Sequence, residues 1–227
     1  MTFRYCNNMD KANPTSFQEL RSLVNQFENH QNLTPESVQR ALSLANMLKG
    51  HVAREAIFSA NESMDDLVSE SIPMLLLSYY TATVLIKGGS AGSQTMDFDK
   101  RKLDLEFSEA NLEEFLSSLN NYGLLHEQVK KAWRKASPTQ ISRDEKIAAH
   151  KRKKEIQTHI EILEKRGDDE ETKRELYIEQ LRFASEQAVE DLKFVKLELE
   201  MLKMRSNPPP TQQVSRGSEP VILKVTV

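Results

Sequence analysis

Residues 178–202 read IEQLRFASEQAVEDLKFVKLELEML. Apolar side chains recur in this stretch at alternating steps of three and four residues, which is the spacing of a heptad repeat. They are Ile178, Leu181, Ala188, Leu192, Val195, Leu199 and Leu202, with Ser185 in the remaining position. Because such spacing places every member on one face of a helix, we expect a long helix that ends near Arg205.

The residues before this stretch indicate a second long helix, from Ser142 to about Arg166. Ala149, Ile156, Ile160 and Leu163 recur there at helical spacing. Gly167 and the acidic residues 168–171 predict a turn followed by the first turn of the next helix, where the helix dipole favours negative charge. We therefore expect an antiparallel hairpin in which the apolar residues of the earlier helix face the heptad repeat.

Five more segments show helical periodicity: residues 15–28, 35–56, 67–86, 97–120 and 124–136. Thr34 followed by Pro35 gives the clearest start, because Thr is a favoured N-cap and Pro fits the first helical position. The segment 67–86 is apolar on most sides, so it should be the most buried helix. The expected buried face of the second helix comprises Val38, Leu42, Ala45, Leu48, Val52 and Ala56. That of the fourth comprises Leu103, Phe107, Leu112, Phe115, Leu116 and Leu119.

These segments predict an all-α fold, an antiparallel helical bundle of about six or seven helices that ends in the long hairpin. We expect a flexible N-terminal tail over residues 1–14, one helical domain over 15–206 and a mostly disordered C-terminal tail over 207–227. Residues 88–94, GGSAGSQ, read as a flexible loop. Within the C-terminal tail, residues 221–227 (VILKVTV) are apolar enough to form a short strand or to dock on another surface.

The composition is typical of a highly helical, water-soluble protein, with 38% hydrophobic and 29% charged residues among 227. A formal net charge of −3 gives no general attraction to nucleic acid or anionic membranes. The most apolar run is too short to span a membrane, and the first residues do not resemble a signal peptide. A single cysteine suits a reducing compartment. We expect a cytoplasmic protein that could also enter the nucleus.

No set of residues indicates catalysis or a bound metal. The five histidines are scattered, without the close pairs of a zinc site: His30, His51, His126, His150 and His159. The glycines at 88–92 lack the Lys-Ser/Thr that completes a phosphate-binding loop. We therefore expect no enzymatic activity, no metal and no cofactor.

The second-last helix opens with a basic stretch, residues 142–156, SRDEKIAAHKRKKEI. At 100° per residue, Arg143, Lys146, His150 and Lys154 fall on one stripe of that helix. Three interpretations are open: a solvated helix face, a nuclear-import or nucleic-acid signal at residues 151–154, or a docking site for an acidic protein surface. The short run, the absence of interleaved aromatic residues and the negative net charge argue against nucleic acid.

Several stretches together resemble one protein family. Residues 57–67, IFSANESMDDL, are similar to its "LFS-x-NE-hydrophobic-acid-acid" signature. Tyr79-Tyr80, the pattern Arg143-x-x-Lys146-Ile147, and residues 174–181, RELYIEQL, are also similar. On these grounds the chain is identified as a member of the TAP-forty-two/alpha-four (immunoglobulin-binding protein 1) family. The resemblance covers residues 17–205, and residues 220–223 resemble a short segment that follows the family's helical domain.

The resemblance implies a tetratricopeptide-like helical domain without catalytic activity. It implies a regulatory, chaperone-like protein that binds the catalytic subunits of type 2A, type 4 and type 6 phosphatases and is linked to TOR signalling. By motif, Arg143 and Lys146 are carried over as contacts to an acidic patch on the phosphatase, with His150, Lys153 and Lys154 as outer contacts. The ubiquitin-binding motif of some members is not carried over, because no acidic run precedes residues 39–49.

One alternative from another class stays open. The heptad repeat over residues 178–202 could serve a structural coiled-coil module that dimerises through this face. The two hypotheses differ in stoichiometry, because the phosphatase-binding hypothesis predicts a monomer on its own.

Overall fold

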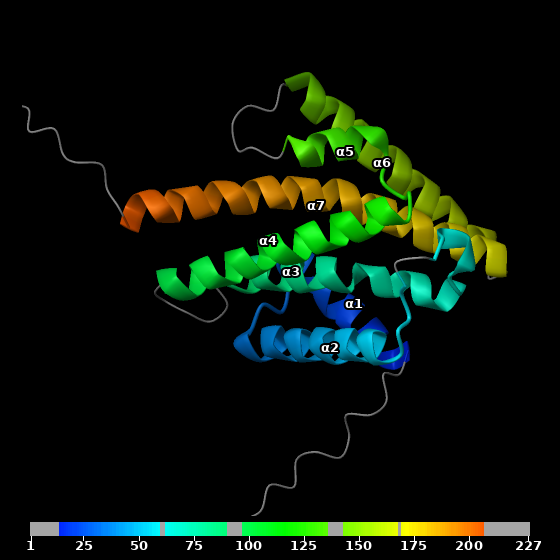
Figure 1. The fold of residues 1–227 in the computed structure, drawn as a ribbon, viewed down its shortest axis with the longest axis horizontal. Coiled ribbons are helices and arrows are strands. Elements are labelled where there is room, and N and C mark those ends of the chain that lie inside the picture. The colour runs from blue at the N-terminus through cyan, green and yellow to red at the C-terminus, as the bar shows by residue number, and fades with distance from the viewer. Residues whose placement is uncertain (1–13, 60–61, 90–96, 136–142, 168, 207–227) are drawn as a thin grey trace, which may run out of the picture.

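The computed structural model describes residues 14–59, 62–89, 97–135, 143–167 and 169–206 (Figure 1). These residues form seven α-helices and two 3-10 helices, and no strand occurs among them. The elements are α1 (Pro14–Glu28), α2 (Pro35–Arg54), η1 (Met64–Asp66), η2 (Ser69–Leu76), α3 (Leu77–Gly88), α4 (Phe98–Asn121), α5 (Glu127–Arg134), α6 (Arg143–Arg166) and α7 (Glu170–Ser206). The predicted all-α class is confirmed. Most of the predicted N-terminal tail, most of the loop at 88–94 and the C-terminal tail lie outside the described residues. Pro14, predicted as the last tail residue, is instead the first residue of α1.

The apolar segment that was expected to be the most buried helix lies in the middle of the bundle. Helix α3 packs against α1, α2 and α4, and nine of its residues are buried. However, the segment is not one α-helix, because residues 69–76 form the 3-10 helix η2 with Pro73 inside it. Proline has no N–H and its ring clashes with the carbonyl four residues earlier, so the α-helix begins only after Pro73, at Leu77.

Helix α2 starts as predicted and ends earlier. The hydroxyl of Thr34 accepts a hydrogen bond from the backbone N–H of Ser37 at 3.2 Å, completing a capping box. The helix ends at Arg54, and Ala56 lies beyond it, exposed, with a positive φ of 46°. The predicted buried face is otherwise confirmed, since Ala45 and Leu48 are fully buried and Val38, Leu42 and Val52 are partly buried against the core. Ala41 and Leu44 are buried as well.

The predicted face of α4 is wrong at its N-terminal end. Leu103 and Phe107 are exposed by 54% and 59%. The buried face is instead formed by Arg101, Leu105, Ser108, Leu112, Phe115, Leu116 and Leu119. Arg101 can be buried because Glu198 on α7 neutralises it, at 2.7 Å from Nε to the carboxylate. A charged residue therefore lies in the core at this end of α4, where the prediction had Leu103 and Phe107 on the buried face.

Gly88 closes α3 instead of opening a loop. A Cβ placed on Gly88 would lie 2.8 Å from both methyl carbons of Val38 on α2. Such a distance is shorter than any ordinary carbon contact, so only glycine lets α2 and α3 approach this closely. The predicted loop therefore begins at least one residue later than expected.

The heptad residues of α7 are buried in the core of their own chain. Leu181, Ala188, Leu192, Val195 and Leu199 all belong to the main core cluster, and α7 packs on α4 and η2. The helical hairpin with α6 is confirmed, but α6 contacts the opposite face of α7, through Gln187 and Glu190. Dimerisation through the heptad face would require this core to open, so in the described residues that face is not exposed for the coiled-coil alternative.

Candidate docking site on α6

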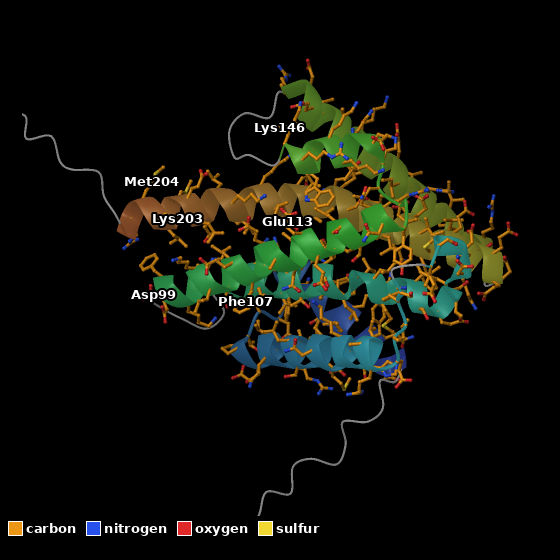
Figure 2. The ribbon with its side chains drawn as sticks, viewed as in Figure 1. Asp99, Phe107, Glu113, Lys146, Lys203 and Met204 are labelled. Carbon is orange, nitrogen blue, oxygen red and sulfur yellow. The ribbon has the colours of Figure 1, made fainter. Side chains whose placement is uncertain are left out.

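The predicted basic stripe lies on the outer face of α6. Arg143, Lys146, His150 and Lys154 are all exposed. Within the part of the chain that the structure describes, no carboxylate forms an ion pair with any of these four side chains. Lys146 lies on the half of α6 that stands away from α7 (Figure 2). These four side chains are therefore available to a partner.

Two other basic residues of the same stretch hold α6 on α7. Arg152 donates from Nε and Nη2 to the two carboxylate oxygens of Glu186, at 2.6 and 3.0 Å. Lys153 donates to Gln187 at 2.6 Å and to Glu190 at 3.0 Å. Of the five predicted site residues, four therefore share the outward stripe, whereas the ammonium group of Lys153 is held by α7.

Helix α5 is held on the bundle and contacts α6 by a hydrogen bond. Val129 of α5 is buried in the core, and the indole N–H of Trp133 donates to Glu113 of α4 at 2.6 Å. Arg152 of α6 in turn donates to Gln128 of α5. In Figure 1 the N-terminal half of α6 diverges from α7, with α5 beside the gap. The first turns of α6 are thus presented at an angle to the bundle.

A groove of about 1140 Å³ lies between α5, the first half of α6 and α7. Its lining residues are Gln128, Lys131, Ala132, Lys135, residues 144–150, Arg152, Glu186, Val189, Glu190 and Lys193. Burial lowers the pKa of Lys193, while Glu145, Glu190 and Glu186 act in the opposite direction. Partial dehydration strengthens the electrostatic interactions of such groups with a ligand of opposite charge.

The structure adds residues that sequence reasoning did not select as site residues. Ile147 follows Lys146, lines the groove and is exposed by 55%. Lys131 and Lys135 reach the same groove from α5. An exposed apolar side chain among cations is typical of the anchor of a protein interface. The closeness of α5 and α6 is a tertiary contact, so no local pattern could have indicated it.

The described residues contain no group of three or more His, Cys, Asp or Glu side chains that could hold a metal ion. None of the helices that the structure describes is both long enough and apolar enough to cross a bilayer.

The model of the TAP42-like family matches residues 14–221. The chain belongs to the TAP42-like family. This confirms the resemblance to the TAP-forty-two/alpha-four family.

Two curated relatives carry names that describe phosphatase-associated proteins. The chain is 28% identical to the serine/threonine-protein phosphatase 4 regulatory subunit ppfr-4 of Caenorhabditis elegans, over 83% of the chain and 61% of the relative. It is also 28% identical to the type 2A phosphatase-associated protein 42 of Saccharomyces cerevisiae, over 81% of the chain and 57% of the relative. The chain thus spans less than two thirds of either relative.

The fold also matches a solved structure. The structure of Tap42 alpha4 subunit superimposes with a TM-score of 0.65, at 24% identity, over 83% of this chain and 97% of the solved one. This likeness supports the helical arrangement described above.

Two of the TAP42-like motifs meet in space. Arg174, at the start of the motif on α7, donates to the carbonyl of Leu67 at 2.8 Å and to the carbonyl of Met64. It also lies 3.4 Å from the hydroxyl of Ser69. Met64 and Leu67 belong to the first motif, residues 57–67. A single guanidinium therefore joins the two motifs, which are more than 100 residues apart in sequence.

Proposed function

We propose that the chain is a non-catalytic regulatory and chaperone-like subunit that binds and stabilises the catalytic subunit of type 2A-like Ser/Thr protein phosphatases. Membership of the TAP42-like family and the names of two relatives support this proposal. The main observation in its support is the exposed basic stripe on α6, where no carboxylate of the described residues neutralises Arg143 or Lys146. The partners would be the catalytic subunits of type 2A, type 4 and type 6 enzymes.

Exposed cations on a helix suit recognition of an acidic surface. Arg143 and Lys146 lie about one turn apart, so they can bind two carboxylates of one patch simultaneously. The charges of Arg143 and Lys146 would steer the partner and fix its orientation. Ile147 would supply an apolar contact with the partner. Loss of one member of a buried interfacial charge pair typically costs about 2–5 kcal/mol.

The test reverses both charges, Arg143→Glu with Lys146→Glu. We expect the double variant to lose capture of a purified type 2A catalytic subunit while its circular dichroism stays unchanged. The matched control is Lys100→Glu with Lys102→Glu, which makes the same change in charge on exposed positions of α4. A folded α6 variant that still captures the phosphatase as well as the α4 control would refute the assignment of the anchors.

The family resemblance also supports two proposals about the role of the protein in the cell. One is a link to TOR signalling, and the other is a location in the cytoplasm and partly in the nucleus. Affinity purification followed by mass spectrometry would test the partners directly. Recovery of type 2A, type 4 or type 6 catalytic subunits with the wild type, and not with the doubly reversed α6 variant, is the expected result.

A further inference from the structure

The apolar side chains that line the groove between α5, α6 and α7 are mostly small. They include Ala132 of α5, Ala148 and Ala149 of α6 and Val189 of α7. Ala149 lies three residues before Arg152, so it shares the side of α6 that faces α7. Val189 is only 4% exposed, so part of the lining is buried apolar surface. The groove can therefore receive bulkier apolar side chains than its own walls supply.

The charges around the groove favour an acidic ligand. Four of the described lining residues are carboxylates, and three of these are already paired, as Glu186–Arg152, Glu190–Lys153 and Glu145–Lys135, at 2.6, 3.0 and 3.9 Å. Lys131, Lys146 and Lys193 also line the groove, and no carboxylate of the described residues forms an ion pair with them. Against these three cations stands one further lining carboxylate, Asp144. The charge that is left without a partner is therefore mainly positive.

The walls of the groove are helices, and they favour a helical ligand. Away from its ends, a helix has no unpaired backbone N–H or C=O group, so it cannot pair with an extended peptide. An extended peptide would leave its own backbone groups unpaired over the apolar lining, whereas a helix satisfies them internally. The volume of about 1140 Å³ also exceeds the roughly 300–1,000 Å³ of typical small-molecule sites.

We propose that this groove binds an acidic amphipathic helix of a partner protein. Large apolar side chains on one face of that helix pack against Ala132, Ala149 and Val189. Carboxylates beside that face bind Lys131 and Lys193, which belong to two different walls, α5 and α7. The contacts made by a phosphatase on the outer face of α6 are not needed for this interaction.

The test uses the full chain and a fluorescein-labelled synthetic peptide of about 18 residues, which is long enough to form a helix in water. Leucines spaced three and four residues apart give the peptide one apolar face, and glutamates flank that face. Fluorescence anisotropy should show saturable binding. A second peptide, with lysine in place of every glutamate, should bind at least about tenfold more weakly. Failure of the acidic peptide to bind, or equal affinity for the two peptides, would overturn the proposal.

A bulky side chain in the groove should block the peptide. Ala148 lines the groove and is exposed, so Ala148→Trp fills part of the groove without entering the core. We expect this variant to bind the acidic peptide at least about tenfold more weakly than the wild type, because the introduced ring clashes with it. The matched control, Ala110→Trp, places the same side chain at an exposed position of α4. Equal affinities of the two variants would mean that the peptide binds elsewhere, and would refute the groove as its site.

Charge reversal tests the lysines of the groove. Lys131→Glu with Lys193→Glu should weaken binding of the acidic peptide at least about tenfold and strengthen binding of the basic one. The matched control, Lys100→Glu with Lys102→Glu, makes the same change in charge on α4 and should leave both affinities unchanged. Circular dichroism checks that each variant is folded. A folded groove variant that binds the acidic peptide as tightly as the α4 control would contradict the proposal. No phosphatase takes part in these measurements, so their outcome is independent of the proposed function.

Discussion

The guanidinium of Arg101 on α4 donates to both carboxylate oxygens of Glu198 on α7, from Nε at 2.7 Å and from Nη2 at 2.8 Å. Its third nitrogen, Nη1, donates to the backbone carbonyl of Ile86 on α3 at 2.9 Å. The side chain of Arg101 is only 7% exposed. One buried side chain therefore joins three helices of the bundle.

Removing this link should strongly destabilise the fold. We expect Arg101→Ala to lower the free energy of unfolding by about 3–5 kcal/mol, because Glu198 and the α3 carbonyl lose a buried partner. Urea unfolding followed by circular dichroism measures the change. The control is Lys102→Ala at an exposed neighbouring position, expected to change stability by no more than about 0.5 kcal/mol. Equal effects of the two substitutions would show that the buried pair contributes little.

The heptad face gives a second prediction, about oligomeric state. Leu192 is fully buried, so Leu192→Asp should lower the free energy of unfolding by more than about 4 kcal/mol through an unpaired buried charge. Light scattering of the wild type should show a monomer. A stable wild-type dimer that Leu192→Asp converts into a folded monomer would favour the coiled-coil alternative instead.

Stability should also depend on pH through Asp191. Desolvation raises the pKa of this carboxyl to about 6 from 3.8, with Glu28 and Glu190 adding to the shift and Gln187 and Lys87 opposing it. The raised pKa means that folding stabilises the protonated form. The contribution of Asp191 is therefore fully present below about pH 4 and is lost as the pH rises through about 6, by up to about 3 kcal/mol.

The substitution Asp191→Asn isolates this effect. Asparagine keeps an oxygen that can accept the hydrogen bond from Gln187, now 3.0 Å from the carboxylate, and carries no charge at any pH. Relative to the wild type, we expect it to stabilise the fold more at about pH 7.5 than at about pH 4. Urea unfolding at both pH values measures the difference. An identical effect of the substitution at the two pH values would contradict the raised pKa.

The rate of phosphatase binding should fall with salt. If exposed cations on α6 steer the partner, the association rate constant decreases as ionic strength rises, because the Debye length shortens from about 10 Å at 0.1 M to about 3 Å at 1 M. Stopped-flow measurements test this dependence. Lys154→Ala should weaken it by removing one exposed cation. A rate independent of salt in the wild type would exclude electrostatic steering by this stripe.

Local patterns predicted most of the secondary structure. The cap at Thr34 and the long helices at the C-terminus were identified correctly because capping and periodicity are properties of neighbouring residues. The buried face of α4 was less predictable. The burial of Arg101 depends on Glu198, 97 residues away in sequence, and no short window contains that information.

The same limit applies to the docking site. Helical periodicity correctly placed Arg143, Lys146, His150 and Lys154 on one exposed stripe. The prediction did not separate Lys153 from these residues, because the distinction depends on side chains of α7, Gln187 and Glu190. Nor could it predict the groove, which requires α5 to lie beside α6. Whether these residues bind a phosphatase stays a prediction.

The attachment of α6 by only part of its length has a consequence for its tolerance of substitution. Arg152 and Lys153 bind α7, whereas the turns that precede them stand away from the bundle. Substitutions at exposed positions of those turns should therefore change the surface charge of α6 and leave the contacts that hold it on α7 in place.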